Sequence, residues 1–285
     1  MTEAGRSALD LVDEWDAPHA SAGVVAGTPP RPVAVRGDST RPHHWASVTK
    51  LATALATLVA VEEGTLALDE EAGPPGATVR HLLAHASGLA FDEHRVLAPP
   101  ERFRIYSNAG YETFAKELAQ RAAMPFDQYL HEAVLEPLAM TGTRLEGSPA
   151  AGLVGPLDDL LRLAAELLAP TLVSRQTIAT ATAVAFPGLA GVLPGFGRQD
   201  PLDWGLGFEL RDGKSPHWTG RRNSPETFGH FGASGSFLWV DPVAGVACAA
   251  LSGRDFDQWA RDAWPAFSDA VVDEFAPHGP VADLT

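Results

Sequence analysis

Ser47 and Lys50 stand three residues apart at the start of an expected helix, which places their side chains on the same helical face. An amine held against a hydroxyl in a dry site can take the hydroxyl proton and leave a nucleophile. A simpler interpretation is that Ser47 is an ordinary helix N-cap and Lys50 lies at the surface. The rest of the chain must separate a catalytic pair from a structural one.

Tyr106 and Asn108 form a second and more specific pair, because the chain has only 3 tyrosines. A phenol near an amine can hold charge as phenolate or pass protons on. An asparagine two residues later offers both a donor and an acceptor, so it can orient the lysine or hold a substrate amide. The structural alternative is a loop tyrosine followed by a turn asparagine, ahead of a helix that starts near Gly110.

A third motif, Gly229-His230-Phe231-Gly232-Ala233, comes just before an expected strand at 236–240. Glycine at a strand edge lets a substrate approach the backbone closely. Two backbone N–H groups aimed at one point can form an oxyanion hole. Trp218-Thr219-Gly220 has a similar composition but lacks a following strand, so the motif around His230 is preferred.

The elements that must position these residues change in type along the chain. We expect strands near both ends and helices between them, which predicts an α+β fold with an antiparallel β-sheet flanked by N- and C-terminal helices. An all-helical lobe at 69–185 is inserted into a sheet lobe at 1–68 and 186–285, and the active site lies in the cleft. The expected helices are 3–16, 47–63, 78–85, 110–122, 126–134, 157–168 and 255–275; the expected strands are 22–26, 32–36, 236–240 and 246–251; and 186–225 is loop-rich.

The helix at 47–63 is predicted to be buried, because it is apolar on nearly every side and ends at Gly64. Lys50 then either reaches the rim or lies inside a site. The only cysteine, Cys248, stands in an apolar run, so we expect a small core residue and no internal disulfide.

The formal net charge of −15 is not offset by any basic cluster, which excludes nucleic acid and disfavours anionic membrane surfaces as partners. The longest apolar stretch, 51–61, is too short to span a bilayer. No apolar signal core follows Met1, which predicts a cytoplasmic protein, although a chain whose leader has been removed would look the same.

The order Ser-x-x-Lys, Tyr-x-Asn, His-x-Gly resembles that of the serine β-lactamase and penicillin-binding-protein superfamily. The most similar branch contains class C β-lactamases, D-aminopeptidases, D-alanyl-D-alanine carboxypeptidases and family VIII carboxylesterases. The resemblance extends over residues 22–255 and includes the segments 61–69, 79–89, 135–143, 204–208 and 236–242. It implies a β-lactamase/transpeptidase-like fold and a serine hydrolase that forms an acyl-enzyme.

Roles follow from the resemblance at matching positions. It implies that Ser47 is acylated, that Lys50 takes the serine proton, and that Tyr106 acts as general base and shuttle. The implied substrate-binding and oxyanion residues are Asn108, which holds Lys50 or the acyl group, His230, Gly232 and Ala233, with the backbone N–H groups of Ser47 and Ala233 forming the oxyanion hole.

The third motif departs from the Lys-Thr-Gly of many β-lactamases. His230 is mostly neutral at pH 7 and Phe231 supplies no hydroxyl, so a substrate carboxylate is weakly anchored unless Arg221, Arg222 or Arg254 compensates. This favours a carboxylesterase acting on small neutral esters. A β-lactamase, or an amidase of the D-aminopeptidase or D-Ala-D-Ala carboxypeptidase type, is the alternative.

Other readings of the chain are weaker. His81 and His85 are four apart and could share a metal, but no zinc-protease glutamate accompanies them, so no metal site is predicted. The chain has no Gly-x-Ser-x-Gly, no phosphate-binding loop and no dinucleotide motif, so no cofactor is predicted. The remote alternative is a catalytically idle binding member of the fold, which would be expected to lose Ser47, Lys50 or Tyr106, whereas this chain has all three. The expected partner is a small ester or amide, and the oligomeric state is not predicted.

Overall fold

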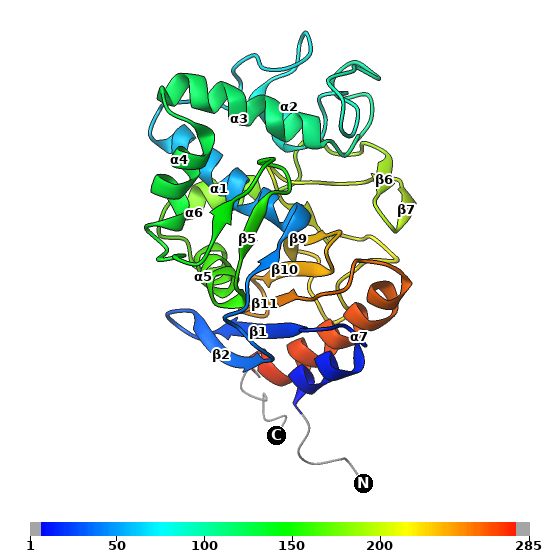
Figure 1. The fold of residues 1–285 in the computed structure, drawn as a ribbon. Coiled ribbons are helices and arrows are strands. Elements are labelled where there is room, and N and C mark those ends of the chain that lie inside the picture. Colours follow the sequence, from blue (N-terminus) through cyan, green and yellow to red (C-terminus); the bar gives the residue numbers. More distant parts are fainter. Residues whose placement is uncertain (1–6, 278–285) are drawn as a thin grey trace, which may run out of the picture.

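A six-stranded antiparallel sheet brings the two ends of the chain together in the computed structural model, which describes residues 7–277 (Figure 1). Its spatial order is β2–β1–β11–β10–β9–β8, and each neighbouring pair is antiparallel. The predicted fold class is confirmed. The strands of this sheet are β1 (Ser21–Ala26), β2 (Arg31–Arg36), β8 (Glu209–Leu210), β9 (Phe228–Gly232), β10 (Ser236–Asp241) and β11 (Val246–Leu251).

Alternating side chains of the sheet enter two separate cores, as the two-residue period of a strand requires. On β10, Phe237 and Trp239 pack with helices η1 and α7 on one face, whereas Leu238 and Val240 pack with α5 on the other. All four side chains are fully buried, and each such burial contributes roughly 1.5–3 kcal/mol. Cys248 belongs to the α7 core, in agreement with its predicted role.

The rest of the described chain forms helices, one small three-stranded sheet and one two-stranded sheet. In Figure 1, α2, α3 and α4 lie beyond the end of the sheet where β9 and β8 are found, and α7 lies along the sheet itself. The helices are η1 (Ala8–Glu14), η2 (Ala46–Val48), α1 (Thr49–Glu62), α2 (Val79–Leu83), α3 (Asn108–Ala122), α4 (Phe126–Leu130), η3 (His131–Leu135), α5 (Leu157–Leu168), α6 (Arg175–Ala181) and α7 (Gln258–Phe275). The remaining strands are β3 (His43–His44), β4 (Arg144–Leu145), β5 (Leu153–Gly155), β6 (Gly191–Leu193) and β7 (Gly197–Gln199).

The buried helix α1 follows its prediction in the interior and differs at its start. Its residues from Thr49 to Ala60 are buried, and Gly64 ends it with a φ of +77°. Ser47, however, is not its N-cap. Ser47 lies in the preceding 3₁₀ turn η2, and α1 begins after Val48 without any side-chain cap. The expectation that Ser47 caps the helix is wrong, because its hydroxyl is turned to other partners.

Three further elements differ from expectation. Helix α2 ends at Leu83, and His85 follows it with a φ of +55°, so His81 and His85 do not share one continuous helical face. The first helix is a 3₁₀ helix over Ala8–Glu14, and residues 3–6 of the predicted helix lie outside the described residues. Helix α6 was not expected from the sequence.

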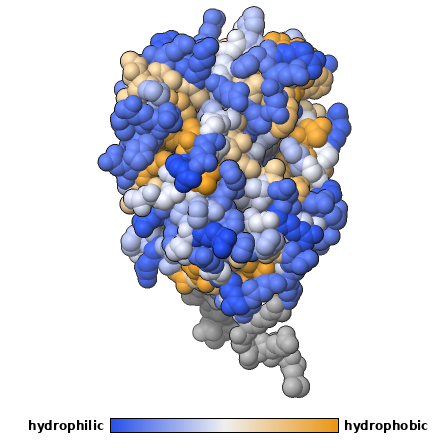
Figure 2. All heavy atoms as spheres, viewed as in Figure 1, coloured by the Kyte–Doolittle hydropathy of each residue, from blue (hydrophilic) through white to orange (hydrophobic). Residues whose placement is uncertain are grey.

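Helix α5 packs across β1, β10 and β11, although its residues fall within the segment expected to form the helical lobe. The division into a sheet lobe at 1–68 and 186–285 and a helical lobe at 69–185 stays a prediction. Among residues 7–277, no helix is long and apolar enough to cross a membrane. The face seen in Figure 2 is mainly hydrophilic, with separate apolar patches.

Candidate active site

Ser47 lies on the tight turn η2, immediately before α1. The preceding residue, Ala46, has a φ of +45°, a strained conformation for a residue with a side chain. The turn is fixed from behind by β10 and the loop before it, because Ser236 Oγ donates to Trp45 O at 2.8 Å and Ser234 Oγ donates to His44 O at 2.7 Å. Strand β10 and the loop before it therefore set the position of Ser47.

Lys50 lies fully buried in the first turn of α1. Its Nζ donates to Asn108 Oδ1 at 2.6 Å and to the Ala150 carbonyl at 2.9 Å, and lies 3.4 Å from Ser47 Oγ. Burial lowers the pKa of Lys50 to about 7, against the opposing charges of Asp92 and Glu112. A neutral amine has two N–H donors and one lone pair, so with both donors occupied the lone pair remains for the serine hydroxyl.

Tyr106 approaches Ser47 from the segment that leads into α3. Its hydroxyl lies 2.8 Å from Ser47 Oγ and 3.4 Å from His230 Nε2. Burial raises the pKa of Tyr106 well above its usual value, so the phenol is protonated at neutral pH. The rings of His85 and Trp204 pack against it, at centroid distances of 4.6 and 6.0 Å, which fixes the direction of the hydroxyl.

Asn108 is the first residue of α3, and two contacts hold it. Its backbone N–H donates to the Phe91 carbonyl at 2.7 Å, and its Nδ2 donates to Asp92 Oδ1 at 2.7 Å. Because Nδ2 faces a carboxylate, Oδ1 must face Lys50. Asp92 orients the amide and raises the lysine pKa, and we did not predict it, because nothing in the sequence of its loop distinguishes it from a solvated surface aspartate.

His230 lies on β9 with a defined tautomer. Its Nδ1 is 2.7 Å from the Phe231 carbonyl, which can only accept, so Nδ1 carries the proton and Nε2 is an acceptor toward Tyr106. Burial, followed by the nearby Lys50, lowers the pKa of His230 to about 3. The third motif therefore presents a neutral ring where many relatives are expected to carry a cation.

Gly232 ends β9 against the backbone that precedes Ser47. A Cβ at this position would lie 2.4 Å from Ser236 Oγ and 2.5 Å from the Trp45 carbonyl, so only glycine fits without movement. The next residue, Ala233, is exposed, and its carbonyl accepts from Phe256 N at 2.8 Å. The strand end thus brings Ala233 beside the turn that carries Ser47.

The three arginines expected to compensate for the missing cation do not contact the site around Ser47. Arg254 donates to the carbonyls of Trp15 and Asp16, and Arg222 forms an ion pair with Asp273 at 3.3 Å. Arg221 lines a different cavity. None of the three forms a hydrogen bond or ion pair with the side chains around Ser47, so the expected compensation is not seen.

An apolar cavity of about 410 Å³ opens beside Tyr106. Its two charged residues are not free, because Arg198 is ion-paired with Asp200 at 3.0 Å and the buried Arg104 donates to four backbone carbonyls. Two of the phenylalanines at this opening are about half exposed. The apolar lining comes from Phe91, Phe103, Ile105, Ala190, Val192 and Pro194.

The sequence also allowed a metal site at His81 and His85 and a third motif at Trp218, but these side chains have structural roles. His81 accepts from Thr78 N through Nδ1, and its Nε2 contacts Glu101 at 3.0 Å. His85 accepts from Ser107 N at 3.1 Å, so each ring is used separately. Trp218 is buried, and its indole N–H donates to Glu209 at 2.9 Å.

Comparisons with known proteins agree with this fold. A crystal structure of a β-lactamase from Mycobacterium bovis (Mb2281c) is 52% identical, with a TM-score of 0.93 over 95% of this chain and 100% of that one. Simvastatin synthase LovD from Aspergillus terreus is 18% identical, with a TM-score of 0.75 over 94% of this chain and 97% of that one. EstCE1, a hydrolase with promiscuous acyltransferase activity, is 17% identical, with a TM-score of 0.76 over 93% and 96%. The last two show similarity of fold alone, and no curated protein matches significantly.

A family model described as Beta-lactamase matches residues 18–271, which includes all three sequence motifs and nearly all of the described structure. The resemblance predicted from those motifs is confirmed at the level of the family. From the extent of this match, together with the 52% identity to a β-lactamase of the same fold, it follows that the chain belongs to the β-lactamase family.

Proposed function

We propose that the protein is a serine hydrolase that forms an acyl-enzyme on Ser47 and acts as a carboxylesterase on small neutral esters. The observation that carries the proposal is the position of Ser47 Oγ, 2.8 Å from the Tyr106 hydroxyl and 3.4 Å from Lys50 Nζ. A nucleophile within reach of both a base and a proton shuttle is the arrangement that covalent catalysis needs.

Lys50 is proposed as the group that accepts the serine proton. With a pKa of about 7 it is about half neutral at pH 7, and its lone pair faces Ser47 because both N–H donors are occupied. As Ser47 Oγ attacks the ester carbonyl carbon, its proton passes to Lys50. The N–H groups of Ser47 and Ala233 are proposed to receive the carbonyl oxygen as it becomes negative.

Tyr106 is proposed as the shuttle in both half-reactions. Its raised pKa disfavours a resting phenolate, so Tyr106 donates its proton toward the leaving alkoxide and regains one from Lys50. In deacylation the same path runs in reverse, and a water molecule takes the place of the alcohol. His230 Nε2 accepts from the phenol when Ser47 does not, which keeps the hydroxyl in place.

Two features favour neutral esters over substrates with a carboxylate. The third motif presents a neutral His230, Arg254 and Arg222 are engaged with other groups, and Arg221 lines a different cavity. The cavity beside Tyr106 is apolar, which suits the hydrocarbon part of an ester. A β-lactamase is the second candidate, and it is favoured by the 52% identity to the protein described as a β-lactamase.

The proposal is tested in two steps. A fluorophosphonate probe is expected to label the wild-type protein at Ser47, and Ser47→Ala is expected to abolish labelling. A side-by-side assay then compares short p-nitrophenyl esters, a chromogenic cephalosporin and D-alanyl amides on both proteins. Absence of labelling in folded protein would remove the hydrolase proposal. Faster turnover of the cephalosporin than of the esters would instead favour the β-lactamase.

A further inference from the structure

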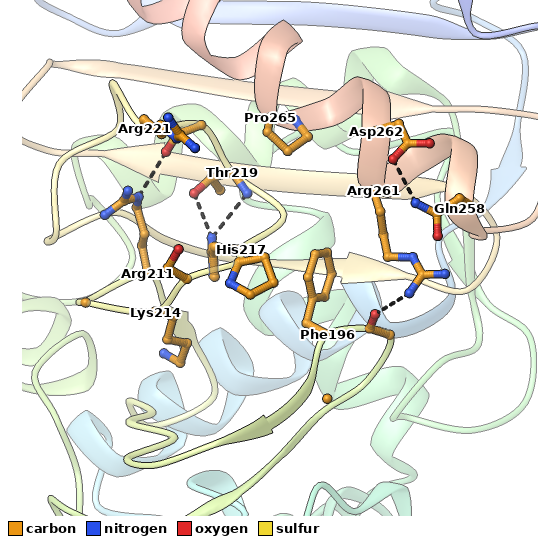
Figure 3. A pocket seen from close by; sticks show the side chains of 16 residues that line it. Phe196, Arg211, Lys214, His217, Thr219, Arg221, Gln258, Arg261, Asp262 and Pro265 are labelled. Carbon is orange, nitrogen blue, oxygen red and sulfur yellow. Dashed lines mark hydrogen bonds between the residues drawn. The ribbon is translucent and has the colours of Figure 1, made fainter.

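A second cavity, of about 680 Å³, lies away from Ser47, between α7, the β6–β7 turn and the loop after β8 (Figure 3). We call it the arginine pocket, because Arg211, Arg221 and Arg261 line it. Its volume is within the range of small-molecule sites. None of its lining residues belongs to the proposed catalytic site, so any ligand here would be additional to the hydrolase substrate.

The charges of these arginines are not neutralised by protein carboxylates. Within residues 7–277, Arg211 and Arg261 donate only to backbone carbonyls, and Arg221 forms no hydrogen bond or ion pair. Nine other arginines in the described part of the chain lie within ion-pair distance of a carboxylate, namely Arg36, Arg80, Arg95, Arg121, Arg144, Arg162, Arg198, Arg222 and Arg254.

The wall of the pocket is built to stay rigid. Buried Glu209 accepts from His217 Nε2 and from the indole of Trp218, each at 2.9 Å, and forms an ion pair with buried Lys214 at 3.2 Å. These contacts lower the pKa of Glu209 to about 2. Because Lys214 and Glu209 balance each other, the wall adds no net charge, and three arginines face a single carboxylate, Asp262, which is already hydrogen bonded to Gln258 at 2.7 Å.

The arginines approach from opposite sides. In Figure 3, Arg211 and Arg221 lie at one side of the pocket and Arg261 at the other, with the rings of Phe196 and Pro265 between them. The Nε of Arg261 is also buried without an acceptor in the protein, which is a costly state for a charged donor. A compact anion can meet only one side of this arrangement.

We propose that the arginine pocket binds a small organic dianion whose two singly charged groups, carboxylates or phosphodiesters, are separated by an apolar spacer. One group pairs with Arg211 and Arg221 and the other with Arg261, while the spacer lies against Phe196. The ligand's charge of −2 matches the excess of three arginines over Asp262. Charge-assisted hydrogen bonds to guanidinium groups supply both affinity and direction.

Calorimetric titration of the full chain tests this proposal with two dianions, adipate and 1,4-butanediol bis(methyl phosphate), at an ionic strength held constant with NaCl. The two probes distinguish carboxylate from phosphate recognition, and acetate serves as the monoanion control. We expect at least one dianion to bind with a dissociation constant of about 1 mM or below, and at least about tenfold more tightly than acetate. No binding of either dianion up to about 20 mM, or equal binding of acetate, would overturn the proposal.

Matched arginine variants locate the site. Arg221→Gln and Arg261→Gln are each expected to weaken binding at least about tenfold. Arg222→Gln removes the same charge from the neighbouring residue, which is paired with Asp273 outside the pocket, and should leave binding unchanged. Equal weakening in Arg222→Gln would show general charge screening and would contradict the assignment. Circular dichroism and thermal unfolding of each variant separate a lost contact from a lost fold.

Discussion

Nζ of Lys50 lies 2.6 Å from Oδ1 of Asn108, so the nearest side-chain partner of this buried amine is a neutral amide and not a carboxylate. A carboxylate at that distance would hold the amine as ammonium. The amide satisfies one N–H donor without stabilising the positive charge to the same degree. This pairing, inside a buried helix, is what leaves the pKa of Lys50 at about 7.

Asn108→Asp is therefore expected to move the pH dependence of hydrolysis. If kcat/KM requires neutral Lys50, it rises as the pH passes through about 7. A carboxylate beside Nζ raises the lysine pKa, so the rising limb should shift to higher pH by about one unit or more. The measurement is kcat/KM for a short p-nitrophenyl ester across the neutral pH range.

The isosteric change Asp92→Asn provides the opposite control. Asp92 raises the pKa of Lys50, so removing its charge should move the same limb to lower pH. If kcat/KM rises at the same pH in the wild type and in both variants, Lys50 is not the group that titrates.

Lys50→Met should lower kcat by about 10³-fold while stabilising the protein. The pKa of Lys50 falls from 10.5 to about 7 on folding, so between these values the unfolded chain binds more protons than the native one. Wild-type stability therefore rises with pH in this window, and the cost of the buried lysine is complete at and below about pH 7. The stability advantage of Lys50→Met should shrink by about 2 kcal/mol from pH 7 to pH 9, measured by urea unfolding. An advantage that does not change with pH would contradict the lowered pKa.

His230→Lys should shift substrate preference toward compounds that carry a carboxylate. The wild-type ring is neutral because its pKa is about 3, so the variant introduces a charge that the motif lacks. The ratio of kcat/KM for a chromogenic cephalosporin to that for a p-nitrophenyl ester should rise about tenfold. His230→Asn keeps the position neutral and should leave this ratio unchanged. The same ratio in both variants would mean that this position does not set the preference.

Gly232→Ala should reduce both stability and activity. Its methyl group would lie 2.5 Å from the Trp45 carbonyl, and a backbone atom cannot move aside without displacing the turn that carries Ser47. We expect a loss of about 1–3 kcal/mol in unfolding free energy, together with slower ester hydrolysis. Gly213→Ala is the matched control, because a methyl group there meets nothing within 4 Å. If the two variants behave alike, the close contact at Gly232 has no consequence for the site.

Much of the fold follows from local patterns in the sequence. The apolar runs at 236–240 and 246–251, separated by a Pro- and Gly-containing turn, predicted β10 and β11 closely, because strand period and turn chemistry are local properties. The burial of the helix around Lys50 was predicted correctly from apolar residues on nearly every side of it. The start of that helix was predicted wrongly, since the turn at Ala46 is imposed by contacts with β10 and the loop before it, about 190 residues away.

The sequence by itself determined which chemical groups are present and in what order: Ser47 and Lys50, then Tyr106 and Asn108, then His230. Only the tertiary structure decided their ionisation and their partners, because pKa values depend on burial and on charges brought in from distant segments. Asp92 reaches Asn108 from a loop with no motif, and Ala150 supplies the second acceptor for Lys50. The three arginines of the second cavity, none of which has a carboxylate partner within the described residues, lie up to 50 residues apart in the chain, and only folding places them around one space.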